Sequence, residues 1–167
     1  MTLVEMPRPA GPCTQHELVH HDGSRRTVYC TEREEAFPEG RLIVSRTDLA
    51  GVITHANEAF VLMSGYTREE LLGAPHHVLR HPDMPRAAFA DLWTTLARGQ
   101  KWHGWVKNLR KDGAFYWVYA TVIANVRGGV VTGYTSVRRK PSRTKIEQMA
   151  RVYADMVAAE NAREARA

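Results

Sequence analysis

The sequence is poor in cysteine and has no long apolar run, and these absences exclude several classes of protein. Its two cysteines, Cys13 and Cys30, do not form the dense pattern of disulfide-stabilised secreted domains, so we expect free thiols. No segment approaches the roughly 20 apolar residues that a membrane-spanning helix needs. The N-terminus also lacks the basic region and apolar segment of a signal peptide. We therefore expect a cytoplasmic protein without a membrane span.

Catalytic motifs are absent as well. The sequence contains no paired nucleophile and base, no glycine-rich phosphate loop, and neither a metalloprotease nor a kinase signature. Residues 80–83, Arg-His-Pro-Asp, carry groups suited to acid–base chemistry, but nothing else in the sequence supplies a substrate site. We therefore do not expect an enzyme.

The net charge of +5 raises the question of nucleic-acid binding. The positive charge is spread along the chain, and no motif for reading a nucleic-acid groove accompanies it. We therefore expect no nucleic-acid partner. One denser basic run follows the last predicted strand, and we interpret it as a solvated linker; its residues are Arg138, Arg139, Lys140, Arg143 and Lys145.

Changes in composition divide the chain of 167 residues into three parts. Residues 1–27 read as a loose N-terminal arm, with a weak hairpin signal at Asp22-Gly23. Residues 28–140 hold the organised domain, and residues 141–167 form a C-terminal amphipathic helix. Several residues in and near the arm are of the zinc-binding type, but they lack the tight paired spacing of zinc sites, so we expect no metal; they are Cys13, His16, His20, His21 and Cys30.

The first part of the organised domain predicts a hairpin and a short helix. Residues 41–57, RLIVSRTDLAGVITHAN, form two short strands with a turn that ends at Gly51. Asn57 stands at the N-cap position of the helix that follows, because its side chain can accept a hydrogen bond from the first helical turn. Gly65 ends this helix.

Two further helices are predicted before the spacing of apolar residues changes from helical to strand-like near Trp102. Thr67 and Glu70 form a capping-box pattern at the start of a second short helix. Asp83, followed two residues later by Pro85, predicts the N-cap of a longer helix that ends at Gly99.

Residues 102–139 have the composition of three strands, joined by turns at residues 111–113 and 127–129. Two strands, several helices and three strands indicate an α+β fold with an antiparallel sheet. A final helix begins near Ser142. Its apolar stripe is suited to packing on the domain or on a second copy of the chain, and consists of Ile146, Met149, Tyr153 and Met156.

The order of these elements, with NEAFVLMSGYTREELLG after the first hairpin, resembles a PAS domain. The segments RHPDMPRAAFADLW, KNLRKDGAFYWV and GYTSVR resemble more narrowly the flavin-binding PAS domain of bacterial aerotaxis receptors. The resemblance covers residues 28–140 and implies a five-stranded antiparallel sheet with short helices on one face. It also implies FAD, bound without a covalent bond, whose redox state reports on oxygen or respiratory electron flow.

The resemblance nominates six cofactor-binding residues: Arg80, His81, Asp83, Trp93, Trp102 and Asn108. This chain departs from the receptors at two nearby positions. Trp105 stands where a small or aliphatic residue is common, and His77 replaces an asparagine. Both departures are candidates for changing the volume or polarity of the pocket.

The chemistry of the nominated residues suits a flavin dinucleotide. Asn108 offers a donor and an acceptor for the pyrimidine edge of the ring, unless it faces solvent. Arg80 can contact the phosphate oxygens of the dinucleotide through two N–H groups. His81 can donate a hydrogen bond to the same phosphates or to the flavin ring. Trp93 and Trp102 are either pocket walls or ordinary core residues. Both cysteines lie at or before the first strand of the domain, so photochemical adduct formation is disfavoured.

These observations predict a redox or oxygen sensor that binds FAD and signals to a separate partner, of the chemoreceptor or kinase type. Self-association into a homodimer through the C-terminal helix or the N-terminal arm is a second way in which the signal could be passed on. One alternative is a cofactor-free PAS interaction module. Another is a haem-binding gas sensor with His77 or His81 as the iron ligand.

Overall fold

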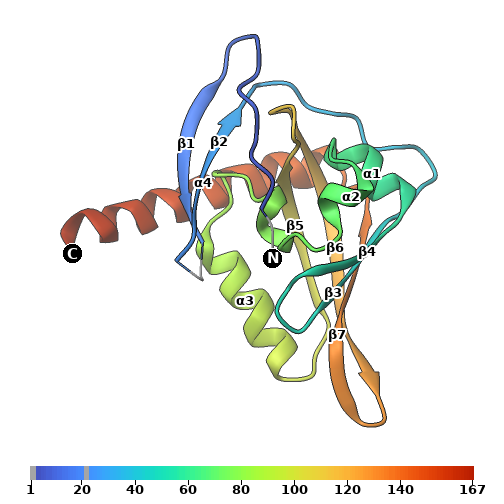
Figure 1. Cartoon of the computed structure of the whole chain (residues 1–167). Coiled ribbons are helices and arrows are strands. Elements are labelled where there is room, and N and C mark those ends of the chain that lie inside the picture. The colour runs from blue at the N-terminus through green and yellow to red at the C-terminus, as the bar shows by residue number, and fades with distance from the viewer. Residues whose placement is uncertain (1–2, 21–22) are drawn as a thin grey trace.

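The computed structural model describes residues 3–20 and 23–167, and its centre is a five-stranded antiparallel sheet (Figure 1). The strands lie in the order β4-β3-β7-β6-β5, which confirms the predicted α+β PAS architecture. The two halves of the sheet come from opposite ends of the domain, since β3 pairs directly with β7. The strands are β3 (Ile43–Asp48), β4 (Ile53–Ala56), β5 (Trp102–Leu109), β6 (Phe115–Arg127) and β7 (Val130–Arg139).

The helical elements between β4 and β5 begin and end largely as predicted. They are α1 (Glu58–Ser64), α2 (Arg68–Leu71), the 3-10 helix η1 (His76–Leu79) and α3 (Arg86–Ala97). Asn57 caps α1 by accepting from the Phe60 backbone N–H at 2.9 Å, and Gly65 ends it with a φ of 76°. Thr67 and Glu70 form the predicted capping box at the start of α2.

The predicted N-cap of α3 is wrong. Pro85, not Asp83, occupies the N-cap position, and no side-chain cap comes from this segment. A tight turn after His81 directs the Asp83 carboxylate toward β5, where it accepts from Lys107 Nζ at 2.8 Å. The carboxylate is therefore used in an ion pair outside the helix.

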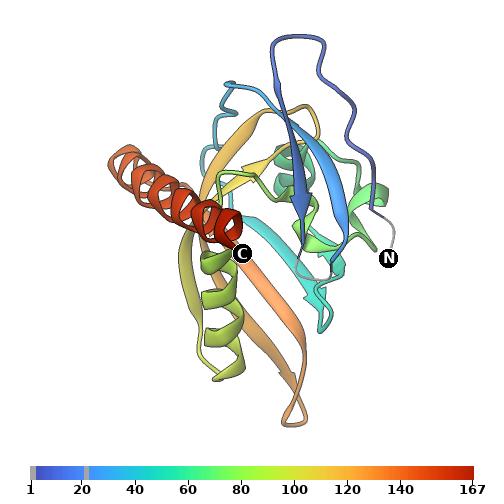
Figure 2. The same ribbon diagram turned by 90° about the vertical axis from the view of Figure 1, so that its left-hand side faces the viewer.

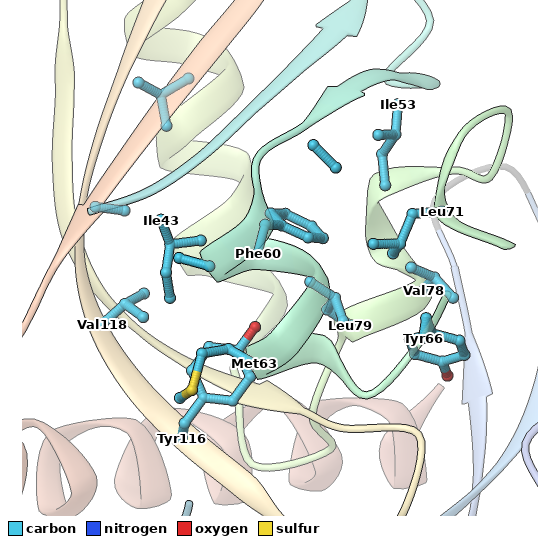
Figure 3. Close-up of a cluster of buried hydrophobic side chains, with 14 of the residues drawn as sticks. Ile43, Ile53, Phe60, Met63, Tyr66, Leu71, Val78, Leu79, Tyr116 and Val118 are labelled. Atoms are coloured by element: carbon cyan, nitrogen blue, oxygen red, sulfur yellow. The ribbon is translucent and has the colours of Figure 1, made fainter. Parts of the chain in front are cut away.

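The main hydrophobic core lies between the sheet and the short helices (Figure 3). Phe60 and Tyr116 are at most 1% exposed, and they meet side chains from α1, η1 and the strands. Truncating a buried aromatic ring such as Phe60 to alanine costs about 3–5 kcal/mol of unfolding free energy. This core holds the helices at a fixed distance from the sheet.

The N-terminal segment forms a two-stranded antiparallel hairpin of β1 (Thr14–Val19) and β2 (Arg25–Cys30). The expected turn position Asp22 lies outside the described residues. Arg26 anchors the hairpin to the helices, because its guanidinium donates to the Val78 carbonyl at 2.7 Å and to the Tyr66 hydroxyl at 2.8 Å. The hairpin is therefore packed on the body of the protein, where a loose arm was expected.

The C-terminal helix α4 (Arg143–Arg166) lies on the opposite side of the sheet from α1 and α2 (Figure 2). Ile146 and Tyr153 of the predicted stripe are buried against Met84 and Trp117. Of the two packing partners left open for this stripe, the structure therefore shows the domain itself. Within the described ranges, no helix combines the length and apolar character needed to cross a membrane.

Candidate functional site

A cavity of about 510 Å³ lies between the inner face of the sheet and the helical segment before β5. Its walls come from β3, β5, β6 and β7 on the sheet side and from η1 and α3 on the helical side, and the end of β1 contributes Val19 and His20. This volume falls within the range of roughly 300–1,000 Å³ that is typical of small-molecule sites. The fold therefore offers a partly open cavity between the sheet and the helices.

Four of the six nominated residues line this cavity: Arg80, Trp93, Trp102 and Asn108. Trp102 is 5% exposed and its indole N–H donates to the Asp91 carboxylate at 2.9 Å, which ties β5 to α3. Trp93 is 41% exposed and packs edge-on against Tyr134 at the cavity rim. The two tryptophans thus form part of opposite walls.

Asn108 and Arg80 are placed side by side by an isolated antiparallel β-bridge between their backbones. Asn108 is 6% exposed and faces inward, so the solvent-facing alternative for this residue is wrong. The Arg80 guanidinium lies 5.0 Å from the Phe89 ring, and its buried Nε has no hydrogen-bond partner. Burial lowers the pKa of Arg80. An amide and a poorly paired cation therefore face the same compartment.

His81 and Asp83 are not among the residues that line the cavity. His81 is 3% exposed, packs edge-on against Phe115, and accepts the Asp83 backbone N–H on Nδ1 at 3.0 Å. Burial lowers the pKa of His81, and the nearby positive charge of Lys107 lowers it further. These two residues shape the turn between η1 and α3.

Sequence reasoning missed the most deeply buried cation of the cavity, Arg138. It is 3% exposed, and Nη2 donates to Ser45 Oγ at 2.7 Å and lies 2.7 Å from His76 Nε2. Burial lowers the pKa of Arg138 to about 10. Burial and the charge of Arg138 lower the pKa of His76 to about 3, so a neutral imidazole accepts from the guanidinium. Arg138 Nη1 is buried without a hydrogen-bond partner.

The interpretation of the basic run as a solvated linker is therefore wrong for Arg138. Strand alternation in β7 places Tyr134, Ser136 and Arg138 on the cavity side, whereas Arg139 and Lys140 are exposed. The missed signal was the alternation within GYTSVR, which assigns Arg138 to the same face as the inward residues two and four positions earlier.

The charge of the cavity wall has one sign. The described residues that line it include three arginines and three histidines but no aspartate or glutamate: Arg80, Arg86, Arg138, His20, His76 and His77. The rings of His20 and His77 stack with their centroids 3.7 Å apart, where the hairpin meets η1. Such a wall favours an anionic ligand, because its described lining residues include no carboxylate, although Arg86 is also paired with Glu160 and Glu164 of α4.

Two other expectations concern residues outside the cavity. Trp105 points to the outer face of the sheet, where it packs against Tyr119 at 5.0 Å, so it does not change the cavity volume as anticipated. Neither cysteine lines the cavity, and burial raises the pKa of Cys30 to about 12. Over residues 3–20 and 23–167, no three His, Cys, Asp or Glu side chains form a group able to hold a metal ion, and His21 lies outside these ranges.

Comparison with known proteins defines the class of this chain. The family model described as the PAS fold matches residues 53–138. The chain belongs to the PAS family, in agreement with the strand order and the position of the cavity.

Its relatives are proteins of signalling and regulation. The aerotaxis receptor of Escherichia coli (strain K12) is 46% identical over 125 residues, which make up 75% of this chain and 25% of the receptor. The nitrogen fixation regulatory protein of Klebsiella pneumoniae is 34% identical over 80 residues, or 48% of this chain and 16% of that protein. The chain thus spans a quarter or less of the length of these relatives.

A similar solved structure is a light-oxygen-voltage domain studied with a flavin analogue. It superposes with a TM-score of 0.55 and 26% sequence identity, covering 74% of this chain and 87% of that one.

Proposed function

We propose that this chain is a redox-sensing PAS module that binds FAD without a covalent bond and relays the redox state of the flavin to a signalling partner. The observation that carries the proposal is the cavity wall, which combines aromatic side chains, one inward amide and three arginines without any carboxylate among its described residues. The similarity to an aerotaxis receptor and to a light-oxygen-voltage domain studied with a flavin analogue supports a flavin as the ligand.

The residues present fit the groups of a flavin dinucleotide. Trp102 and Val106 supply apolar surface against which the flat flavin ring can pack. Asn108 supplies both a donor and an acceptor for the polar edge of that ring. Arg80 and Arg86 supply cationic N–H donors of the kind that pair with a pyrophosphate. The unpartnered Nε of Arg80 and Nη1 of Arg138 are the buried donors that such a ligand would satisfy.

FAD supplies a ring that accepts and releases electrons, and the protein supplies the electrostatic environment for it. The neutral His76 and the Ser45 hydroxyl hold the Arg138 guanidinium in place. This fixed positive charge stabilises an added negative charge in the cavity and so favours reduction of the ligand. Arg138 lies on the central strand β7 and Asn108 on the edge strand β5, so both strands present a polar side chain to the ligand from the inner face of the sheet. A change in ligand charge therefore acts directly on the strands.

The test is to purify the chain, record its visible absorbance, denature it and identify the released compound by mass. We expect the two-band flavin spectrum and a mass equal to that of FAD. A Soret band would indicate haem, and a colourless protein that takes up no added FAD would refute the proposal. Asn108→Ala is expected to lose the colour while its circular dichroism stays unchanged, whereas His55→Ala, at an exposed position of β4, keeps the colour.

A further inference from the structure

The first turn of α3 is capped by a residue from α4. Pro85 occupies the N-cap position and supplies no side-chain cap, so the first N–H groups of α3 need another acceptor. The Glu160 carboxylate accepts from the Arg86 backbone N–H at 3.0 Å and from the Ala87 backbone N–H at 2.9 Å. Its negative charge also complements the positive end of the α3 dipole. Glu160, more than seventy residues away in sequence, therefore caps the N-terminus of α3.

The same carboxylate faces the cations at one end of the cavity. Glu160 Oε2 lies 3.9 Å from Nε of Arg86, and Glu164 forms a second ion pair with the Arg86 guanidinium. Arg86 lines the cavity, as does Arg80. The negative charge of Glu160 raises the pKa of Arg80 against the larger lowering effect of burial, so its field reaches this side chain too. Glu160 is thus a negative charge shared by two cavity cations.

Helix α4 is also tied to the strand that carries Asn108. The Tyr153 hydroxyl donates to the Trp105 carbonyl of β5 at 2.7 Å, and the Lys145 ammonium lies 4.9 Å from the Trp105 ring. The helix therefore contacts both α3 and β5, which form adjoining walls of the cavity.

We propose that Glu160 is a positioning residue that couples the docking of α4 to the occupancy of the cavity by an anionic ligand. The inference rests on the proposed function, in which the pyrophosphate of FAD lies near Arg80 and Arg86. The ligand anion and the Glu160 carboxylate then both interact with Arg80 and Arg86, and the two negative charges repel each other. Coupling of this kind is reciprocal, so a ligand that weakens α4 docking is itself bound more weakly when α4 is docked.

The test compares the wild type with Glu160→Gln and with the control Glu147→Gln, which removes a charge from an exposed position of the same helix. Glu160→Gln keeps one oxygen that can accept from the α3 backbone, but it loses the negative charge and one of the two hydrogen bonds to α3. We expect FAD to bind the Glu160→Gln protein about fivefold more tightly, at the lower end of typical coupling factors. Hydrogen exchange of α4 supplies a second readout, which FAD should accelerate in the wild type and in Glu147→Gln but not in Glu160→Gln.

The outcomes separate this inference from the proposed function. If FAD binds the wild type but leaves α4 exchange unchanged, or if both variants bind FAD equally, the coupling is refuted and FAD binding stands. If the wild type binds no FAD, the proposed function fails, and the coupling is then tested by measuring α4 exchange with inorganic pyrophosphate as the anion. Faster α4 exchange with pyrophosphate in the wild type, but not in Glu160→Gln, supports it; no effect in either refutes it.

Discussion

Arg138 is a buried cation whose hydrogen-bond partners are uncharged. A buried cation is costly unless it is paired, yet Arg138 contacts the neutral partners Ser45 and His76 and the face of the Phe60 ring, whose centroid is 4.9 Å away. No carboxylate is among the described residues that line the cavity around it. A charge held in this way lowers stability in the absence of a ligand, and an anion in the cavity compensates for it.

We expect Arg138→Met to raise the stability of the cofactor-free protein while weakening FAD binding. Methionine removes the buried charge and fills a similar volume, which should add about 1 kcal/mol to the free energy of unfolding. Loss of charged hydrogen bonds should weaken FAD binding by about tenfold or more. Urea denaturation and FAD titration measure the two effects, with the exposed Arg139→Met as the control. A less stable protein with unchanged affinity would assign Arg138 a purely structural role.

His76 gives stability a dependence on pH. Burial, with the charge of Arg138, lowers its pKa from 6.5 in the unfolded chain to about 3 in the folded protein. Between these values only the unfolded chain takes up the proton, so stability is full above pH 6.5 and falls as the pH drops toward 3. The loss is at most about 1.4 kcal/mol per pH unit for this residue.

Urea unfolding at a series of pH values on both sides of 6.5 measures this slope. His76→Asn should flatten the acid side of the profile, and exposed His55→Asn should leave it unchanged. Burial also lowers the pKa of His81, so part of the slope should remain in His76→Asn. A profile identical to that of the wild type would show that His76 is protonated equally in both states.

At the scale of elements, the turn between η1 and α3 and the helix α4 depend on each other. Met84 of this turn packs in the same cluster as Trp117, Ile146 and Tyr153, while the Asp83–Lys107 ion pair fixes its outer side. The ring of Tyr153 stacks on that of Trp117, and its hydroxyl is bonded to β5. Docking of α4 therefore stabilises the turn that carries Arg80 toward the cavity.

Tyr153→Phe isolates the polar part of this docking. The ring contacts are retained, but the Trp105 carbonyl loses its donor, so we expect about 1 kcal/mol less protection of α4. Hydrogen exchange should show faster exchange throughout α4, with little change in α1. Val152→Ala, at a position that is 41% exposed, serves as the matched control. Equal exchange in the two variants would mean that the hydroxyl contributes nothing to docking.

At the scale of the whole molecule, the cavity assembles segments from the full length of the chain. The end of β1, the turn between β3 and β4, α3 and three C-terminal strands all supply wall residues, and the hairpin packs against η1 through Arg26. A ligand in this position contacts elements that are held together only in the folded state. Its binding must therefore stabilise the folded state against global unfolding, even where α4 docking becomes weaker.

Added FAD is expected to raise the melting temperature of the protein. A free concentration about 100-fold above the Kd contributes about 2.7 kcal/mol. For a domain of this size the gain corresponds to an upward shift of about 5–10 °C. Differential scanning fluorimetry with and without FAD measures the shift, and Arg138→Met should show a much smaller one at the same concentration. An unchanged melting temperature in the wild type would contradict specific binding.

The predictable features were those determined by neighbouring residues. The Asn57 cap, the Thr67–Glu70 box and the Gly65 stop each depend on contacts within one turn, and each was confirmed. The order of strands and helices likewise identified the PAS fold. Asp83 had an equally good local pattern, but a tertiary contact with Lys107 was available to its carboxylate, and Pro85 became the N-cap instead.

The sequence by itself determined the elements, their order and the family, because periodicity, caps and turns are local properties. Only the tertiary structure decided which charges are buried and which side chains share a compartment. Arg138 faces inward because β7 pairs with β3 on one side and β6 on the other, and Glu160 caps α3 because α4 folds back across β5. Strand alternation groups Arg138 with Tyr134 and Ser136 on one face, but which face is buried, and that Glu160 meets α3, depend on the register and packing of the complete sheet.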